Sequence, residues 1–369
     1  MSLFKKNSSN IAGVKFAKTS KDEFISTLRK RVNSYFKENN ISKHANAKMV
    51  FKTISLLAMY FVPFGLLLAG ATTHIGLNLL LWAIMGFGMA GIGMSVMHDA
   101  IHGAYARNPM MNKVIGSVLY FIGGTVSNWK MQHNELHHTY TNVHGLDHDI
   151  DVSPILRVCP HDKRYPLHRF QHIYAWGVYS LLTLFWCTVK DFSQSIQYRA
   201  MGIVKSKKQY RKLMVEVIGS KLFYFTYVLL LPILFAPVAI WVTIIGFVIM
   251  HMIAGLILSS VFQLAHVMPG TEFPLPDEKG SLENTWAIHQ MFTTMNFSKN
   301  SRILSWFVGG LNYQIEHHLF PNICHVHYKA ISDIVKKTAS EYNLPYYSQK
   351  NFVMALRSHA NILKSLGRA

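Results

Sequence analysis

Long apolar stretches without charged side chains dominate the pattern of this chain. The first two cover residues 53–70 and 75–97 and are separated by a short polar connection. A third stretch, residues 222–263, has His251 as its one side chain that titrates near neutral pH and is twice the ~20 residues that one crossing of a bilayer needs. Pro237 marks its break, so we expect spans at about residues 222–240 and 243–265. The pattern predicts an all-α integral membrane fold with four transmembrane helices in two hairpins.

Two shorter apolar runs are predicted to stay on one side of the membrane. Residues 114–126 are too short to cross. Residues 173–189 are borderline in length, but basic residues precede and follow them, which favours a cytoplasmic location for both ends. With four crossings, both termini lie in the cytoplasm, and the polar segments form a cytosolic helical cap.

The chain divides into three parts on this interpretation. Residues 1–50 form a cytoplasmic N-terminal arm, residues 51–335 the membrane domain, and residues 336–369 a cytoplasmic C-terminal tail. Residues 21–39 of the arm are amphipathic, a pattern that fits a helix on the membrane surface and a packed helix equally well.

Composition supports a membrane location. Charged residues make up 15% of the chain, against about 25% in ordinary soluble domains. The formal net charge of +19 fits cytoplasmic segments held against anionic lipid headgroups. No nucleic-acid recognition motif accompanies the charge, so we expect no nucleic-acid partner. The three cysteines form no CxxC pair, which argues against a thiolate metal site. No signal peptide is visible at the N-terminus.

Histidines gather beside the apolar stretches, all on one predicted side of the membrane. His98 and His102 follow the second span, and their four-residue spacing places both side chains on one helix face. An HxxxHH cluster, a QxxHH cluster and the end of the last span supply more imidazoles. One HxxxH pair alone is more often structural, but three clusters at one membrane face point to a site for two metals. The candidate ligands are His98, His102, His133, His137, His138, His266, His317 and His318.

Polar side chains close to these histidines are candidates for indirect roles. The neutral amide of Gln314 is a poor direct ligand, but it could hold a metal-bound water or ligate weakly. Gln263 lies one turn before the last-span histidine. Carboxylates within the clusters could accept hydrogen bonds from the ligand imidazoles and so orient them; these are Asp99, Glu135 and Glu316.

Other titratable residues are expected to stay outside the site. Asp147, Asp149 and Asp151 fit a solvated acidic turn better than a binding role. About 22 Å of regular helix separates His251 from His266, so His251 should lie within the membrane, away from the metals.

Eight imidazoles without a cysteine cluster favour redox-active metals over structural zinc. The HxxxH, HxxxHH and QxxHH boxes resemble those of the membrane fatty-acid desaturase family. In the third box, Gln314 stands where a first histidine is expected, and in this respect the box resembles that of the front-end branch, the delta-5, delta-6 and related acyl desaturases. Residues 263–266 resemble an additional ligand segment of that branch. The resemblance covers residues 50–330. It implies two iron ions, O₂ as co-substrate, and a cis double bond introduced into an acyl-CoA or acyl-lipid. Asn128 and Trp129 resemble a segment that contacts the substrate headgroup in acyl-CoA desaturases.

The sequence departs from many front-end desaturases in one respect. It has no His-Pro-Gly-Gly haem motif of a fused cytochrome b5 domain. We therefore expect electrons from a separate donor, ferredoxin or cytochrome b5 with its reductase, and a location in a bacterial inner membrane. A di-iron fatty-acid hydroxylase or alkane monooxygenase is the nearest alternative, because the same metals can place oxygen on carbon. A metal transporter is a more distant one, since it needs ionisable residues at mid-depth in several spans.

Overall fold

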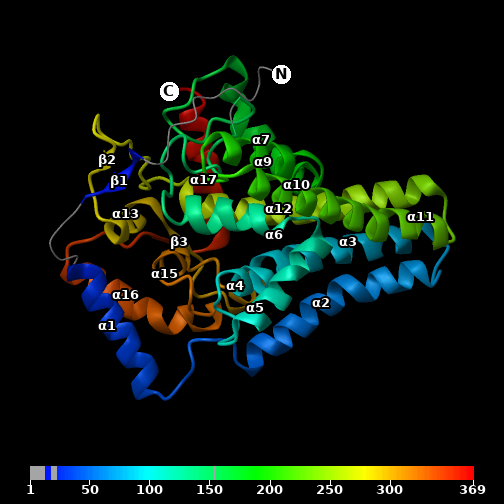
Figure 1. Cartoon of the computed structure of the whole chain (residues 1–369), viewed down its shortest axis with the longest axis horizontal. Coiled ribbons are helices and arrows are strands. Elements are labelled where there is room, and N and C mark those ends of the chain that lie inside the picture. Colours follow the sequence, from blue (N-terminus) through cyan, green and yellow to red (C-terminus); the bar gives the residue numbers. More distant parts are fainter. Residues whose placement is uncertain (1–12, 18–22, 153) are drawn as a thin grey trace.

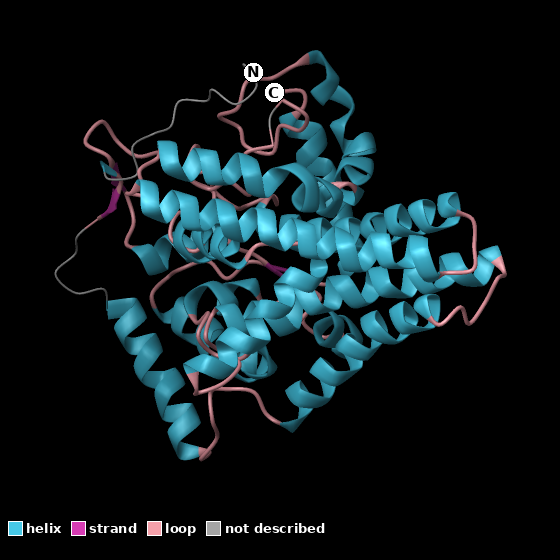
Figure 2. Ribbon diagram, turned by 45° about the vertical axis from the view of Figure 1, so that its right-hand side comes forward, coloured by secondary structure: helices cyan, strands magenta, loops and turns pink. Residues whose placement is uncertain are grey.

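The computed structural model describes residues 13–17, 23–152 and 154–369, and these are mostly helical (Figure 2). Two short parallel strand pairs complete the fold. β1 (Lys15–Phe16) pairs with β2 (Ser281–Leu282), and β3 (Asn296–Phe297) pairs with β4 (Ser348–Gln349). The pairs tie distant parts of the chain together but form no larger sheet.

Four helices are long and apolar enough to cross a membrane. They extend to one side of the molecule, at the right of Figure 1. The first is α2 (Ala47–Leu68), which begins where the Asn46 side chain accepts a hydrogen bond from the Met49 amide. The second, residues Ile75–Ile101, comprises α3 (Ile75–Gly91), a π-helical turn (Ile92–Val96) and α4 (Met97–Ile101). The fourth is α12 (Ile240–His266).

The third of these helices differs from its expected range of 222–240. It runs over Lys207–Phe235, comprising α10 (Lys207–Phe225), a π-helical turn (Thr226–Leu230) and α11 (Leu231–Phe235). Ser206 and Gln209 form a reciprocal capping box that starts the helix in its charged segment. The hydropathy pattern does not detect the first turns of α10, because they are rich in lysine and arginine. The helix ends before Pro237, which cannot continue it.

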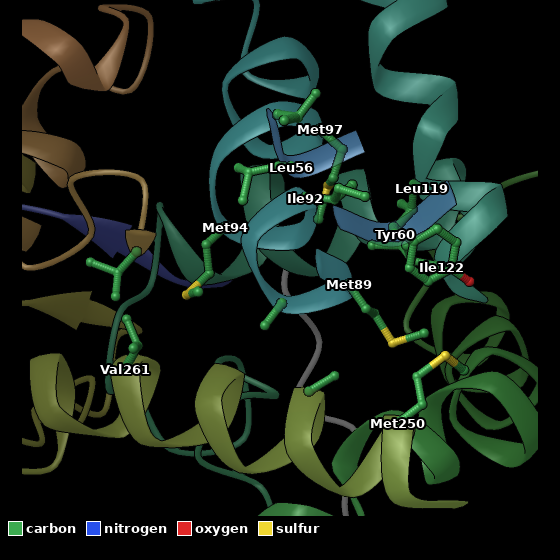
Figure 3. Packing of buried hydrophobic residues seen from close by; sticks show 14 of the residues in the cluster. Leu56, Tyr60, Met89, Ile92, Met94, Met97, Leu119, Ile122, Met250 and Val261 are labelled. Atoms are coloured by element: carbon green, nitrogen blue, oxygen red, sulfur yellow. The ribbon is translucent and has the colours of Figure 1, made fainter. Parts of the chain in front are cut away.

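Glycines allow the apolar helices to approach one another closely. A Cβ on Gly88 would lie 2.8 Å from the Tyr60 backbone nitrogen, and one on Gly86 would lie 2.7 Å from the Met250 carbonyl oxygen. These two positions hold α3 against α2 and α12. Around them, methionine, leucine and aromatic side chains form the largest apolar core, part of which Figure 3 shows.

The remaining helices gather at the other end of the molecule. Those used below are α1 (Glu23–Glu38), α13 (Trp286–Thr293), α15 (Gln314–Leu319), α16 (Tyr328–Glu341) and α17 (Phe352–Leu366). Shorter helices are α5 (Pro109–Gly116), α6 (Val126–Trp129) and α14 (Arg302–Phe307). The segment expected not to cross, residues 173–189, lies within α7 (Gln171–Ser180), α8 (Leu182–Phe185) and a π-helical turn (Trp186–Lys190), and α9 (Asp191–Ala200) follows it.

Parts of the predicted arm and tail are integral to this end of the fold. Helix α1 buries Phe24, Leu28 and Val32 in a cluster shared with α16, so the amphipathic pattern marks a packed helix. Helix α17 lies against α7 and α12, where His359 bonds through its two ring nitrogens to the Val267 carbonyl and the Tyr179 hydroxyl. Divisions at residues 50 and 335 therefore do not mark breaks in packing.

Candidate metal centre

The eight predicted ligands converge from four segments, which are the ends of α4 and α12, the π-helical segment Lys130–His137 and helix α15. His98, His102, His133 and His317 form one group, in which one ring nitrogen of each lies within 4.8 Å of the others. A second group on the same criterion contains His137, His266 and His318. The sequence therefore found residues that the fold brings together from positions more than two hundred residues apart.

His138 lies between the two groups. Its Nε2 atom is 3.2 Å from that of His133, and its ring stacks on His318 with the centroids 4.4 Å apart. His133 Nε2 is also 3.1 Å from His98 Nε2. Nitrogens bound to one metal at 2.0–2.1 Å lie roughly 3.0–3.4 Å from each other, so the His98–His133 spacing is that of co-ligands, while His138 lies within reach of either group.

Several buried ring nitrogens of the centre have no hydrogen-bond partner among the described residues. An unpaired buried polar atom costs about 1–3 kcal/mol, which bound metals would offset. The atoms are His102 Nε2, His137 Nε2, His138 Nδ1, His266 Nε2, His317 Nε2 and His318 Nε2. This set of converging, unpaired imidazole donors fits two metal ions.

The opposite ring nitrogens of four candidate ligands are held in place. His137 Nδ1 lies 3.0 Å from Asp147 Oδ2, and His318 Nδ1 lies 2.7 Å from Gln290 Oε1. Tyr328 Oη lies 3.1 Å from the Nδ1 atom of His317, while the Nδ1 atom of His266 lies 3.3 Å from the Thr293 carbonyl oxygen. Such contacts fix the ring orientation and the tautomer that faces a metal.

Asp147 corrects one expectation. Its side chain is fully buried rather than part of a solvated turn, and it also accepts hydrogen bonds from the amides of Asn142 and Asp149. The His137 imidazole beside it holds the pKa of the Asp147 carboxyl below its usual range, against the effect of burial. Because Asp147 follows His137 by only ten residues, the sequence itself indicates that this carboxylate can lie near the ligand. Gln290 and Tyr328 carry no comparable local signal, because only tertiary packing brings them to the centre.

The carboxylates expected to orient ligands take other partners. Asp99 accepts hydrogen bonds from the backbone amide and Nδ1 of His325, whose Nε2 lies 2.7 Å from Lys52 Nζ. Glu316 accepts from the Tyr346 hydroxyl and the Asn296 amide. Glu135 is exposed, and no hydrogen bond joins it to an imidazole within the described residues. These three carboxylates therefore do not contact the candidate ligands in the way the sequence suggested.

The two glutamines are placed differently. Gln314 is buried one turn before His317, and both polar atoms of its amide lack a partner among the described residues. Gln263 donates a weak hydrogen bond of 3.4 Å to the Asp149 carbonyl oxygen, and its own side-chain oxygen is unpaired. Gln314 thus offers a free amide beside the third histidine cluster.

A cavity of about 230 Å³ adjoins the centre. Its walls include His98 and His133 at one part and apolar residues of the spans elsewhere, among them Met94, Leu258 and Phe262. Trp129 also lines this cavity and packs on His133 with ring centroids 4.4 Å apart. Asn128 does not line it, since its amide bonds to the Asp191 carbonyl and to Ser195.

Burial keeps most of these imidazoles neutral. It lowers the pKa values of His102, His133, His138, His317 and His318 well below the usual value. His137 is the exception, because the Asp147 carboxylate outweighs burial and raises its pKa. Neutral imidazole is the form that binds a metal.

His251 lies apart from these groups. Its Nε2 is 2.8 Å from the Tyr224 hydroxyl, and its Nδ1 is 3.0 Å from Thr183 Oγ1. These contacts join α12 to α10 and α8, which indicates a structural role.

Comparison with known proteins bears on the chemistry of this centre. The sequence profile described as "Fatty acid desaturase" matches residues 75–350, a range that contains all eight candidate ligands. The chain belongs to the fatty acid desaturase family. The resemblance seen in the three histidine boxes is thereby confirmed.

Several relatives of this desaturase cover nearly its whole length. It is 34% identical to "sn-1 linoleoyl-lipid 6-desaturase" of Synechocystis sp., over 95% of this chain and 97% of that protein. It is 35% identical to "Acyl-lipid (8-3)-desaturase" of Physcomitrium patens, over 96% of this chain and 74% of that protein. The "sn-1 linoleoyl-lipid 6-desaturase" of Arthrospira platensis is 33% identical over 93% of this chain and 92% of that protein. The desaturase is thus similar to enzymes named for front-end positions.

Proposed function

We propose that this desaturase introduces a cis double bond near the carboxyl end of an acyl chain carried by a membrane lipid. The observation that carries the proposal is a pair of buried imidazole groups, the first of which lines a largely apolar cavity through His98 and His133. Relatives named for lipid-bound linoleoyl chains favour a lipid carrier over acyl-CoA. The apolar walls would keep water from the reacting carbon atoms.

The polar residues of the cavity support front-end selectivity. Gln132 donates a hydrogen bond to Asp149, whose Oδ2 lies 3.5 Å from His137 Nδ1. Both residues line the cavity together with Lys190, beside the candidate ligand His133. A polar ester placed among these side chains would bring the first carbon atoms of the chain close to the centre.

We infer that the cofactor is a pair of iron ions. The first imidazole group would hold one ion, and the second group with His138 would hold the other. Two irons, when bound, supply the electron transfers that couple O₂ reduction to removal of two hydrogens from the chain. The residues named above hold the ligand rings in orientation, and Gln314 offers an amide to a water in the centre.

The proposed topology places both termini and the centre in the cytoplasm. The pairs α2–α3 and α10–α12 would form two membrane hairpins joined by residues 69–74 and 236–239, with the other helices as a cytosolic cap. The basic residues flanking the spans support this orientation. A separate ferredoxin, or cytochrome b5 with its reductase, would supply electrons, and the host membrane would be a bacterial inner membrane.

Fatty-acid profiling tests the proposed reaction. The desaturase is expressed in cells that lack polyunsaturated lipids but have a suitable electron donor, and the cells are fed linoleate. We expect a new cis double bond on the carboxyl side of the existing ones, and none with His137→Ala at matched protein level. A hydroxylated product would favour the monooxygenase alternative, whereas no modified product from any supplied chain would contradict the proposal.

A further inference from the structure

The segment containing α7 and α8 lies directly on the membrane-spanning helix α12. Thr183 Oγ1 donates a hydrogen bond of 2.8 Å to the His251 carbonyl, and Ser259 Oγ donates one of 3.2 Å to the Tyr179 carbonyl. Between them, a Cβ on Gly255 would come within 2.4 Å of the Ser180 carbonyl oxygen. The two backbones are therefore as close as glycine allows.

These contacts fix the depth of the segment. Helix α12 has 27 residues and a length of about 40 Å, which exceeds the ~30 Å hydrocarbon core. His251 lies about 16 Å from the end of α12 that is remote from the metal centre. That places His251, and Thr183 bonded to it, near the middle of the bilayer.

Both ends of the segment return to the side of the metal centre. At the start, the Gln171 side chain donates a hydrogen bond of 2.7 Å to the Leu363 carbonyl of α17. At the other end, Asn128 donates one of 2.7 Å to the Asp191 carbonyl, and Asn128 precedes the candidate ligand His133 by about one turn. Residues 171–190 thus enter to mid-depth and leave on the same side.

The outward surface of this segment is apolar. Leu181, Phe185 and Val189 are 50%, 46% and 43% exposed, and their four-residue spacing places them on one face. Ile173 is 66% exposed on the same segment, and no Asp, Glu, Lys or Arg occurs from residue 171 to 189. Side-chain hydroxyl groups also donate hydrogen bonds to nearby backbone carbonyls, as Thr188 Oγ1 does to the Leu184 carbonyl oxygen. This is the composition that a lipid-facing element requires.

The cavity beside the metal centre lies between this segment and α12. Leu182 and Phe185 line it from the segment, and Leu258 and Phe262 line it from α12. Phe185 both lines the cavity and is nearly half exposed. The wall at Phe185 therefore separates the cavity from the bilayer.

We propose that residues 171–190 form a re-entrant membrane element and that a lipid-bound acyl chain reaches the metal centre from the bilayer beside Phe185. The polar part of the cavity supports a lipid, because Lys190 stands there with Asp149 and Asp151 and offers no cationic cluster for a polyanionic carrier. The access route rests on the proposed desaturase function, whereas the depth of the element does not.

Nitroxide labels test the depth. Leu181→Cys and Phe185→Cys are labelled in lipid bilayers, with Lys205→Cys in the exposed α9–α10 loop as reference. The unsubstituted protein measures background labelling of its three buried cysteines. We expect O₂ to relax the two segment labels more than a water-soluble nickel chelate does, and the reverse at residue 205. Equal access of the nickel chelate to residues 181 and 205 would overturn the proposal.

Paired substitutions test the access route in bilayers containing the lipid-borne substrate. Phe185→Trp should lower kcat/KM about tenfold through overpacking at the opening. Leu181→Ala is the control, since Leu181 is similarly exposed but does not line the cavity, and it should keep kcat/KM within about twofold. Retained iron content confirms that each variant is folded. Equal rates for Phe185→Trp and the parent would refute the route, while an inactive parent with buried labels would count against the desaturase function alone.

Discussion

At the scale of single residues, burial and hydrogen bonding prepare the imidazoles for metal. The rings turn one nitrogen inward, and in four of them the other nitrogen is held by Asp147, Gln290, Tyr328 or the Thr293 carbonyl. The sequence identified the inward-facing ligands because they recur at helical spacing. It did not identify most of these supporting groups, because they come from distant segments with no shared pattern.

The lowered imidazole pKa values predict acid sensitivity of the metal-free protein. The unfolded chain binds protons near pH 6.5, whereas these buried rings bind them only at lower pH. Stability is therefore complete above about pH 6.5 and falls as the pH decreases below it. Thermal unfolding of chelator-treated protein should show a lower Tm at about pH 5.5 than at about pH 7.5. A Tm that stays constant or rises on acidification would contradict this.

Asp147→Asn tests the support of His137. The amide is nearly isosteric but carries no charge to orient and polarise the ring, so metal affinity should fall about 10–100-fold at that site. Titration with a competing chelator measures this change. Asp162→Asn is the matched control, because Asp162 is also buried beside a histidine, His144, outside the centre. Equal losses in both variants would show that Asp147 has no specific role.

Gln314→Ile tests the unpaired amide. Isoleucine neither donates nor accepts, so the variant should have little activity, whereas Gln314→His should be impaired but retain more. The ratio of unsaturated product to substrate at matched protein level reports the effect. Full conversion by Gln314→Ile would mean that Gln314 is only packed.

At the scale of elements, composition predicted which helices are apolar but not where they start. Ser206 starts the third helix within a basic segment, and the hydropathy pattern detects only its later part. The segment at residues 173–189 was correctly left out of the four spans. Its close packing on α12 depends on Gly255 and Ser180, a tertiary contact that periodicity does not reveal.

His251→Ala separates element packing from metal binding. The substitution removes a ring that bonds α10 and α8 to α12, so Tm should fall by a few degrees, as for loss of one or two buried hydrogen bonds. Iron content and desaturation should stay close to those of the parent, in contrast to His318→Ala. Loss of iron from folded His251→Ala protein would contradict the separation.

At the scale of the whole molecule, four apolar helices extend from a set of shorter helices, and four segments distant in sequence meet at the candidate metal centre. The family and the front-end resemblance were readable from the three boxes and are confirmed by comparison. The cavity and the membrane depth of residues 171–190, which form part of its wall, could not be predicted from the sequence. Apolar residues in the spans, in the core and around a cavity have the same sequence pattern.

The central claim is that two irons held by these imidazoles perform the desaturation. The most direct test measures desaturation rate against iron bound per chain during reconstitution of metal-free protein in lipid bilayers with an electron donor. The account predicts activity that reaches its maximum at about two irons per chain and is absent without iron. Full activity at one iron per chain or fewer would contradict it.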